Sequence, residues 1–365
     1  MLLLGLTSLC SAPGGIPAFN RLLCRAAAEW AEAHGEQVRV LVLCDEPAGR
    51  VGQDVPPGYQ AFGGHRMRFS AALAAALIRC PMLCLGHVHL APLGLLSPRG
   101  FGVVAHGTEV WSPLPRLRRF ALRRARVVAC VSRHTAGCVQ QMQGVEPERC
   151  LRVINALDPA SFADVLTNDV ALPAADQPGG RPLEVFSLTR LQLGEPKGID
   201  LMLHAVARLP ELRYTVAGEG DALPGLRALA ARLGVSERVR FLGRVTDAER
   251  ANLLAGCDVF ALPSSGEGFG IVYLEAMAHG KPCIAARAGG APEVVLDGET
   301  GLVVPAQTDA LVEALRRLMD PGLRARLGAA GRARVRAQFC YPQFREHAFA
   351  LFDRLATLTP AHWPL

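Results

Sequence analysis

The sequence of 365 residues contains no uninterrupted apolar stretch close to the ~20 residues that a membrane-spanning helix needs. The longest candidate, residues 69–78, stops at Arg79 and Pro81. The apolar opening, residues 1–6, has no basic residues before it and runs into Pro13-Gly14-Gly15. We therefore expect a buried strand there rather than a signal peptide, and a cytoplasmic protein.

The cysteines of the sequence are not clustered, and lysines are scarce. The 11 cysteines are scattered without a CxxC pair, which argues against a zinc site or a disulfide framework and favours a reducing compartment. Lys197 and Lys281 are the only lysines. Residues 1–165 nevertheless carry 17 arginines against 11 acidic residues, whereas the remainder carries 22 charges of each sign. The N-terminal half is thus the half suited to an anionic surface or acceptor.

Short apolar runs alternate with helix-length segments, a pattern typical of α/β proteins with parallel sheets. We expect strands at residues 2–6, 38–44, 82–86, 103–106, 127–131, 151–154, 184–188, 214–217, 239–242, 258–262 and 282–285. We expect helices at residues 18–33, 198–207, 223–233, 247–255, 272–279 and 341–355. Loop-forming residues replace the periodic pattern between Asp158 and Pro182. The prediction is two Rossmann-like domains, residues 1–165 and 166–340, facing each other across a cleft.

Two glutamates, Glu267 and Glu275, bracket a glycine-containing run between an expected strand and an expected helix. Glu267 falls in a loop at the carboxyl end of the strand, where ligands bind in doubly wound sheets. Glu275 falls one to two turns into the helix, and the glycines between them let backbone amides approach a phosphate. The arrangement indicates a phosphorylated, hydroxyl-rich ligand; an acidic loop and a helix-surface glutamate are the simpler alternative.

Residues 262–282, continued by residues 288–301, resemble the donor site of retaining GT-B glycosyltransferases, the glycosyl transferases group 1 family (glycosyltransferase family 4-like). The resemblance implies a GT-B fold of two Rossmann-like domains, with the last helix, residues 341–365, crossing back onto the first. It implies transfer of a hexosyl unit from a UDP- or GDP-sugar in the C-terminal domain to a glycan or lipid-linked acceptor in the N-terminal domain. It also implies front-face substitution, in which the leaving phosphate helps remove the proton, with no metal or other cofactor.

The same resemblance implies roles for single residues. Glu275 would bind the ribose, and Glu267 and His106 would orient the transferred sugar. Arg190 and Lys197 would bind the diphosphate and neutralise the leaving group, although Thr189 and a longer Arg-to-Lys spacing depart from the usual pattern. Further donor contacts are implied at Gly14, Gly15, Gly218, Glu219, Arg244, Val245, Gly268, Phe269, Gly270 and Ile271. Glu109 stands where the family often has an aspartate, so its role is open.

Other functions remain open at this point. A GT-B nucleotide-sugar epimerase would share the architecture, and so would a non-catalytic protein that binds a nucleotide sugar or a carbohydrate. The segment Arg116–Arg126 has six arginines and no acid, so it could dock on anionic lipid headgroups or be a solvated helix face. It has no aromatic stacking platform, which argues against nucleic-acid binding. The run Gly218-Glu219-Gly220-Asp221 lacks the spacing of a dinucleotide-binding fingerprint.

Overall fold

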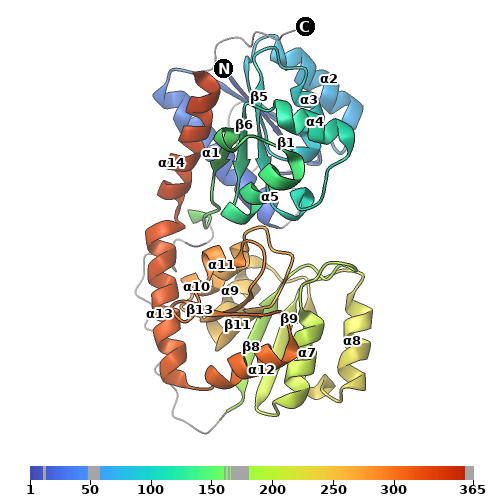
Figure 1. Ribbon diagram of the computed structural model, residues 1–365, viewed down its shortest axis with the longest axis vertical. Helices are drawn as coiled ribbons and strands as arrows, with labels where there is room; N and C mark the ends of the chain where they lie inside the picture. Colours follow the sequence, from blue (N-terminus) through green and yellow to red (C-terminus); the bar gives the residue numbers. More distant parts are fainter. Residues whose placement is uncertain (11–13, 48–57, 160–161, 163–164, 166–180, 358–365) are drawn as a thin grey trace. The chain divides into compact units, whose positions relative to one another are not determined.

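The computed structural model describes residues 1–10, 14–47, 58–159, 162, 165 and 181–357. The chain forms two compact units, Met1–Asp158 with Tyr341–Leu365, and Pro159–Cys340. Pro13 and most of the expected linker, residues 172–180, lie outside the described residues. Each unit contains one sheet in which every strand pair is parallel (Figure 1).

The first unit contains a seven-stranded sheet with the order β3-β2-β1-β4-β5-β6-β7. Its strands are β1 (Leu2–Leu6), β2 (Val38–Val42), β3 (Tyr59–Ala61), β4 (Met82–Leu85), β5 (Phe101–Ala105), β6 (Val127–Cys130) and β7 (Cys150–Arg152). All five residues of β1 are buried, as expected of a central parallel strand covered on both faces. The strand predicted at residues 2–6 is therefore present, with the same bounds.

Helices cover both faces of the first sheet. The core on one face is formed with α2 (Arg66–Leu77), α3 (Ala91–Gly94), α4 (Arg116–Arg124) and α5 (Arg133–Gln143). The other face carries α1 (Gly15–Ala33) and α14 (Tyr341–Ala356), which lie side by side (Figure 1). Trp30 Nε1 donates to Asp353 Oδ1 at 2.7 Å, and the Phe19 and Phe344 rings meet edge to face at 5.2 Å. The last helix is thus part of the first unit's core.

The second unit contains a six-stranded sheet with the order β10-β9-β8-β11-β12-β13. Its strands are β8 (Leu183–Leu188), β9 (Leu212–Ala217), β10 (Val239–Gly243), β11 (Val259–Leu262), β12 (Cys283–Ala286) and β13 (Gly301–Val304). Its helices are α7 (Ile199–Arg208), α8 (Leu223–Arg232), α9 (Asp247–Gly256), α10 (Ile271–Ala278), α11 (Ala291–Val294), α12 (Thr308–Arg317) and α13 (Pro321–Gln338). α7 packs against α8 and α12, and α10 packs against α13.

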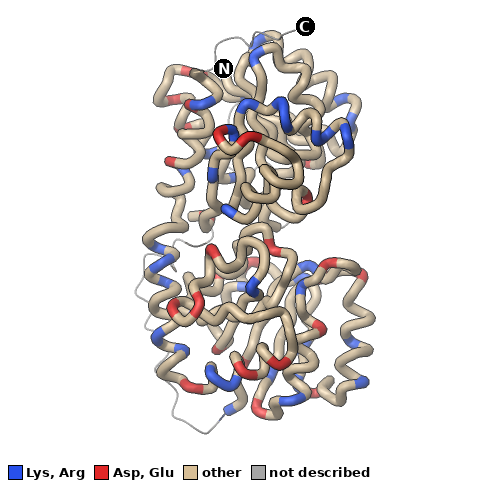
Figure 2. The backbone as a smooth tube through the Cα atoms, viewed as in Figure 1, with Lys and Arg blue, Asp and Glu red and all other residues tan. Residues whose placement is uncertain are grey.

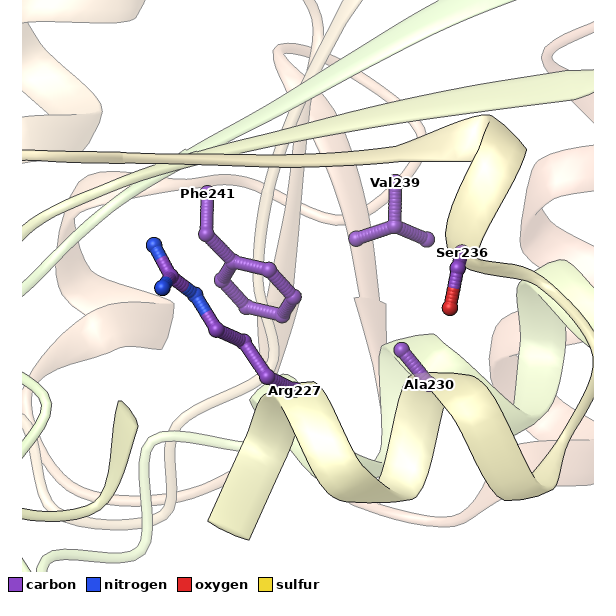
Figure 3. Close-up of a pocket in the computed structure, with 5 residues that line it drawn as sticks. All are labelled: Arg227, Ala230, Ser236, Val239 and Phe241. Carbon is purple, nitrogen blue, oxygen red and sulfur yellow. The ribbon is translucent and has the colours of Figure 1, made fainter. Parts of the chain in front are cut away.

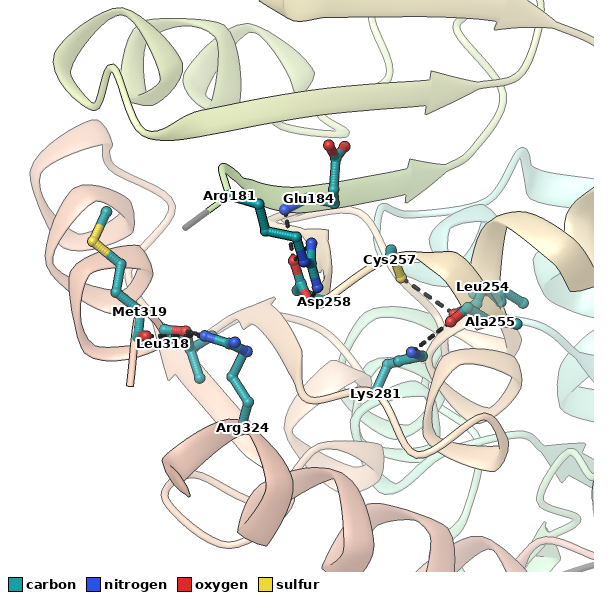
Figure 4. A network of polar contacts seen from close by, with 10 residues as sticks. All are labelled: Arg181, Glu184, Leu254, Ala255, Cys257, Asp258, Lys281, Leu318, Met319 and Arg324. Atoms are coloured by element: carbon teal, nitrogen blue, oxygen red, sulfur yellow. Dashed lines mark hydrogen bonds and ion pairs between the residues drawn. The ribbon is translucent and has the colours of Figure 1, made fainter. Parts of the chain in front are cut away.

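A polar network ties the central strands of the second sheet together at their amino ends (Figure 4). The Arg181 guanidinium donates to both carboxylate oxygens of Asp258, at 2.9 and 2.6 Å. Asp258 also accepts the backbone N–H of Glu184 at 2.9 Å, which links the starts of β8 and β11. Nearby, Lys281 Nζ donates to the carbonyl of Ala255 at 2.7 Å. These contacts fix the two strands whose opposite ends carry the predicted site.

The α/β fold with two parallel, Rossmann-like sheets is confirmed. The sequence analysis missed β3 and β13, which are one edge strand of each sheet. β3 has only three residues, and β13 follows directly on a turn at Gly298, where φ is +72°. β3, Tyr59-Gln60-Ala61, contains no run of apolar residues, and the apolar run of β13 is limited to residues 302–304.

Candidate functional site

The order of strands in the second unit creates a switch point between β8 and β11. The connections after these neighbouring strands run in opposite directions along the sheet, and doubly wound sheets bind ligands at the carboxyl ends of such strands. The loop after β8 carries Arg190 and Lys197, and the loop after β11 carries Glu267. The predicted residues therefore converge on the edge where doubly wound sheets bind ligands.

A continuous chain of opposite charges occupies this edge. Lys197 Nζ lies 2.9 Å from Glu267 Oε1 and 3.6 Å from Glu195 Oε2. Arg190 Nη2 lies 3.2 Å from Glu195 Oε1. The side chains of Lys197 and Glu267 are only 14% and 13% exposed, whereas that of Arg190 is 69% exposed. Lys197 is thus a fixed cation, and Arg190 is the one with more freedom to reach a ligand.

Close backbone contacts hold the Lys197 loop against the Glu267 loop. Gly198 has φ +72°, and a Cβ there would lie 2.5 Å from the carbonyl oxygen of Pro263. The backbone N–H of Ser265 donates to the Pro196 carbonyl at 3.0 Å. Only glycine allows this approach, so the Lys197–Glu267 pair depends on it.

The loop after β9 approaches the same edge. Gly218 and Gly220 have φ +138° and +153°, and a Cβ at Gly218 would lie 1.7 Å from the carbonyl oxygen of Thr189. The Gly218 N–H donates to the Gly243 carbonyl at 2.7 Å. Beyond Gly243, Arg244 Nε donates to Glu219 Oε1 at 2.9 Å. Glu219 and Arg244 therefore pair with each other on the exposed rim, and Val245 is half-buried.

The glycine run after Glu267 leads into the amino end of α10. Gly270 caps the helix with φ +96°, and no acidic residue stands in the first turn. The Phe269 ring is buried and meets the ring of Phe339, the residue after α13, edge to face at 5.9 Å. Phe269 therefore anchors the loop in the core, and Gly268 and Ile271 remain half-buried beside it. Free N–H groups at such a helix end favour an anionic group.

Glu275 lies inside α10 and is almost completely buried, with 7% of its surface exposed. Burial raises the pKa of its carboxyl to about 7, nearby Arg250 lowers it, and Asp247 raises it further. Arg250 Nε lies 3.5 Å from Glu275 Oε2, an oxygen that accepts no hydrogen bond from the described residues. A buried carboxylate with unused acceptor capacity is suited to a hydroxylated ligand.

The first unit has its own switch point between β1 and β4. Gly14, with φ +142°, precedes α1 after β1, and both Gly14 and Gly15 are exposed. His106 follows β5 and is half-buried. The structure therefore assigns Gly14, Gly15 and His106 to the carboxyl-end edge of the first sheet.

His106 is held as a neutral ring. Its Nε2 lies 2.8 Å from the Gly86 carbonyl oxygen, which can only accept, so Nε2 carries the proton. Burial is the main cause that lowers the pKa of His106, against the opposing charge of Glu109. The His106 backbone N–H donates to Glu109 Oε1 at 2.5 Å. The Glu109 side chain therefore stabilises the turn between His106 and Glu109. The sequence had left the role of Glu109 open.

A depression of ≈ 310 Å³ lies elsewhere in the second unit, between α8 and the edge strand β10 (Figure 3). It is lined by Arg227, Ala230, Ser236, Val239 and Phe241, none of which is a predicted site residue. Among the described residues, no group of three or more His, Cys, Asp or Glu side chains could hold a metal ion. The prediction that the reaction needs no metal stays a prediction.

The family model "Glycosyl transferases group 1" matches residues 178–334, which contain the charge chain and Glu275. A GDP-mannose-dependent alpha-(1-6)-phosphatidylinositol monomannoside mannosyltransferase of Mycolicibacterium smegmatis is 38% identical over 268 residues, or 66% of this chain and 69% of that relative. The chain belongs to the glycosyl transferases group 1 family. A D-inositol 3-phosphate glycosyltransferase of Streptomyces bingchenggensis is 35% identical over 57% of this chain and 58% of its own length.

Solved structures agree on the fold of this glycosyltransferase. Anabaena Alr3699/HepE in complex with UDP aligns with TM-score 0.76 at 22% identity, covering 98% of this chain and 100% of that one. Sucrose-phosphate synthase from Thermosynechococcus elongatus aligns with TM-score 0.75 at 22% identity, covering 98% and 99%. The GT-B prediction is confirmed.

The structure brings Arg190, Lys197 and Glu267 to one edge of the second unit. It also identifies two residues that the motifs did not single out. Glu195 bridges Arg190 and Lys197, and Arg250 faces Glu275 from the neighbouring helix. Glu195 lies in the unusually long segment between Arg190 and Lys197, and that length was the feature of the sequence that could have drawn attention to it. No feature of the sequence pointed to Arg250.

Proposed function

We propose that this glycosyltransferase moves a hexosyl unit, with retention of configuration, from a nucleotide-diphosphate sugar to a lipid-linked or phosphorylated glycan acceptor. GDP-mannose is the first donor to test, because the similar mannosyltransferase is GDP-mannose-dependent by name. A UDP-sugar is the second, since the similar Anabaena fold holds UDP. The acceptor class follows the phosphatidylinositol monomannoside and inositol phosphate in the names of the relatives.

The observation that carries the proposal is the Lys197–Glu267 pair at 2.9 Å, at the switch point of the second sheet. A cation and a carboxylate side by side suit the two parts of a sugar diphosphate, because the cation can bind the phosphates and the carboxylate can bind the sugar hydroxyls. Lys197 would stabilise the negative charge that develops on the leaving diphosphate, and Glu267 would accept hydrogen bonds from sugar hydroxyls through its second oxygen.

The remaining residues would divide the other tasks. Arg190, more exposed than Lys197, would close on the diphosphate, and Glu275 would accept the ribose hydroxyls. The Nε2–H of the neutral His106 ring is taken by the Gly86 carbonyl, so Nδ1, a hydrogen-bond acceptor, would orient the transferred sugar, and the ring is not suited to acid catalysis. The departing phosphate oxygen would take the proton of the acceptor hydroxyl on the same face, so the new bond forms with retention.

We also propose that α4 rests on an anionic lipid surface. Leu117 and Phe120 are 61% and 49% exposed, whereas Ala121 and Leu122 of the same helix are buried in the core. Arg116, Arg118 and Arg119 flank the two exposed apolar residues in the sequence of α4, and basic residues follow the helix (Figure 2). Between Asp54 and Glu109 the sequence has no acidic residue. No helix among the described residues has the length and apolarity to cross a bilayer, so contact would be interfacial.

Release of nucleoside diphosphate tests the proposal. The full chain would be incubated with GDP-mannose, UDP-glucose and related donors, with and without phosphatidylinositol mannosides or inositol phosphate. We expect one donor to yield diphosphate in an acceptor-dependent manner, with the α-linked sugar appearing in the product. No diphosphate with any donor and acceptor would overturn the transferase proposal. Conversion of the nucleotide sugar into a different nucleotide sugar when no acceptor is present would indicate an epimerase instead.

A further inference from the structure

Arg250 is a residue of α9 that supports Glu275 from one side. Its Nε lies 3.5 Å from Glu275 Oε2, and that oxygen accepts no hydrogen bond from the described residues. The charge of Arg250 therefore holds the Glu275 carboxylate on that side, while the capacity of Oε2 to accept hydrogen bonds stays unused. A ligand with adjacent hydroxyls could complete it.

Arg250 is itself fixed from two further directions. Its Nη2 lies 3.3 Å from Asp247 Oδ1, and its Cζ lies 5.7 Å from the centre of the Phe162 ring. Only 22% of its side chain is exposed. A guanidinium held by a carboxylate and an aromatic face has little freedom to swing away from Glu275.

We propose that Arg250 is a positioning residue that keeps Glu275 ionised and oriented toward the ribose of the donor. The inference rests on the proposed function, because it takes Glu275 as the ribose ligand. An ionised carboxylate accepts hydrogen bonds from both ribose hydroxyls, whereas a protonated carboxyl uses one oxygen as a donor.

Other charges around Glu275 do not replace Arg250. Asp247 on α9 opposes ionisation of Glu275. His279, the residue after α10, binds the Glu275 carbonyl oxygen through Nδ1 at 2.8 Å, and burial is the main cause that lowers its pKa, which favours the neutral ring. Arg332 of α13 and Lys281 oppose the protonation of His279. Arg250 is the cation that lowers the pKa of Glu275, so its loss would raise that pKa further.

The test is the pH dependence of nucleotide-sugar affinity, measured by calorimetric titration from about pH 6 to about pH 8.5. A nucleotide sugar is the right probe because its diphosphate does not titrate in this range. Wild-type affinity should rise with pH as Glu275 ionises. Arg250→Gln should bind about tenfold more weakly at neutral pH and recover most of the loss at the alkaline end. Arg250→Lys should remain within about threefold of wild type, since it keeps the charge.

Two controls separate this role from a structural one. Arg240→Gln, at an exposed arginine of β10, should leave affinity and its pH dependence unchanged. A 2′,3′-dideoxyribose analogue of the donor should bind wild type and Arg250→Gln equally. A loss that is the same at every pH, or equal affinity of the two proteins for the ribose donor, would overturn the inference.

A second readout does not need a nucleotide. Carbon-13 NMR of glutamate-labelled protein, with Glu275→Gln to assign the signal, measures the pKa of Glu275 directly. Arg250→Gln should raise that pKa, and an unchanged pKa would overturn the inference. If wild type binds no nucleotide sugar, the proposed function fails, while this measurement still decides whether Arg250 keeps Glu275 ionised.

Discussion

At the scale of single residues, the two lysines of the chain offer a matched comparison. Lys197 pairs with Glu267 at the carboxyl ends of the strands, and Lys281 donates to the Ala255 carbonyl near the amino ends. Both side chains are largely buried. We therefore expect one to serve the reaction and the other to serve the fold.

Lys197→Met should lower kcat by about 10²–10³, because it removes a cation that stabilises the leaving diphosphate in the transition state. The melting temperature should also fall, because the largely buried Glu267 carboxylate loses its cation. Lys281→Met should leave kcat intact and destabilise the fold by about 1–3 kcal/mol, since the Ala255 carbonyl loses its donor. Steady-state kinetics and urea unfolding of both variants measure the contrast. Equal kcat for Lys197→Met and wild type would remove Lys197 from the mechanism.

Residues that the sequence could predict differ from those that it could not. Glu267 and Glu275 were detectable because their motif is local, and Arg190 and Lys197 because they follow one strand. The Arg250–Glu275 pair is a tertiary contact between α9 and α10, which no spacing along the chain reveals. The burial that raises the pKa of Glu275 likewise depends on packing around α10.

At the scale of elements, glycine loops bring the strand ends together. Gly218→Ala would set a Cβ 1.7 Å from the Thr189 carbonyl oxygen, on backbone with φ +138°. We expect it to lower the free energy of unfolding by more than about 3 kcal/mol and to weaken donor binding, because the loops after β8 and β9 must separate. Urea unfolding followed by circular dichroism measures the stability.

Gly234→Ala is the matched control, since Gly234 has φ +68° but open space around it. That variant should cost about 1–2 kcal/mol, the strain of a left-handed alanine alone, and should keep donor affinity. Similar losses for the two variants would show that the close approach at Gly218 is unimportant.

Central strands were predictable as elements because each is a continuous apolar run covered on both faces. β1 and β11 are buried along their whole length. The edge strands β3 and β13 were missed: Tyr59-Gln60-Ala61 contains no apolar run, and the apolar run of β13 covers only residues 302–304, after a turn at Gly298. For α4 the sequence left two readings open, and the structure divides the helix between them: Ala121 and Leu122 are buried, and Leu117 and Phe120 are exposed.

At the scale of the whole molecule, the uneven charge predicts binding to anionic membranes. The full chain should cosediment with phosphatidylglycerol vesicles but not with phosphatidylcholine vesicles, and added salt should release it. A double variant, Leu117→Ser with Phe120→Ser, should bind several-fold more weakly, because apolar burial is lost while every arginine remains.

Met142→Ser serves as the control, since Met142 is a 41% exposed apolar residue on α5. It should bind vesicles as wild type does. Equal binding of the double variant and wild type would exclude α4 as the lipid contact, even if the protein still binds lipid through other residues.

The central claim is that the carboxyl-end edge of the second unit holds a nucleotide sugar. A crystal structure of the chain grown with GDP-mannose, or with the donor that the release assay selects, tests it most directly. We predict ribose hydroxyls within hydrogen-bond reach of the Glu275 carboxylate and the diphosphate against Arg190 and Lys197. A nucleotide bound elsewhere, for example in the depression between α8 and β10, with Glu275 and Lys197 untouched, would contradict the account.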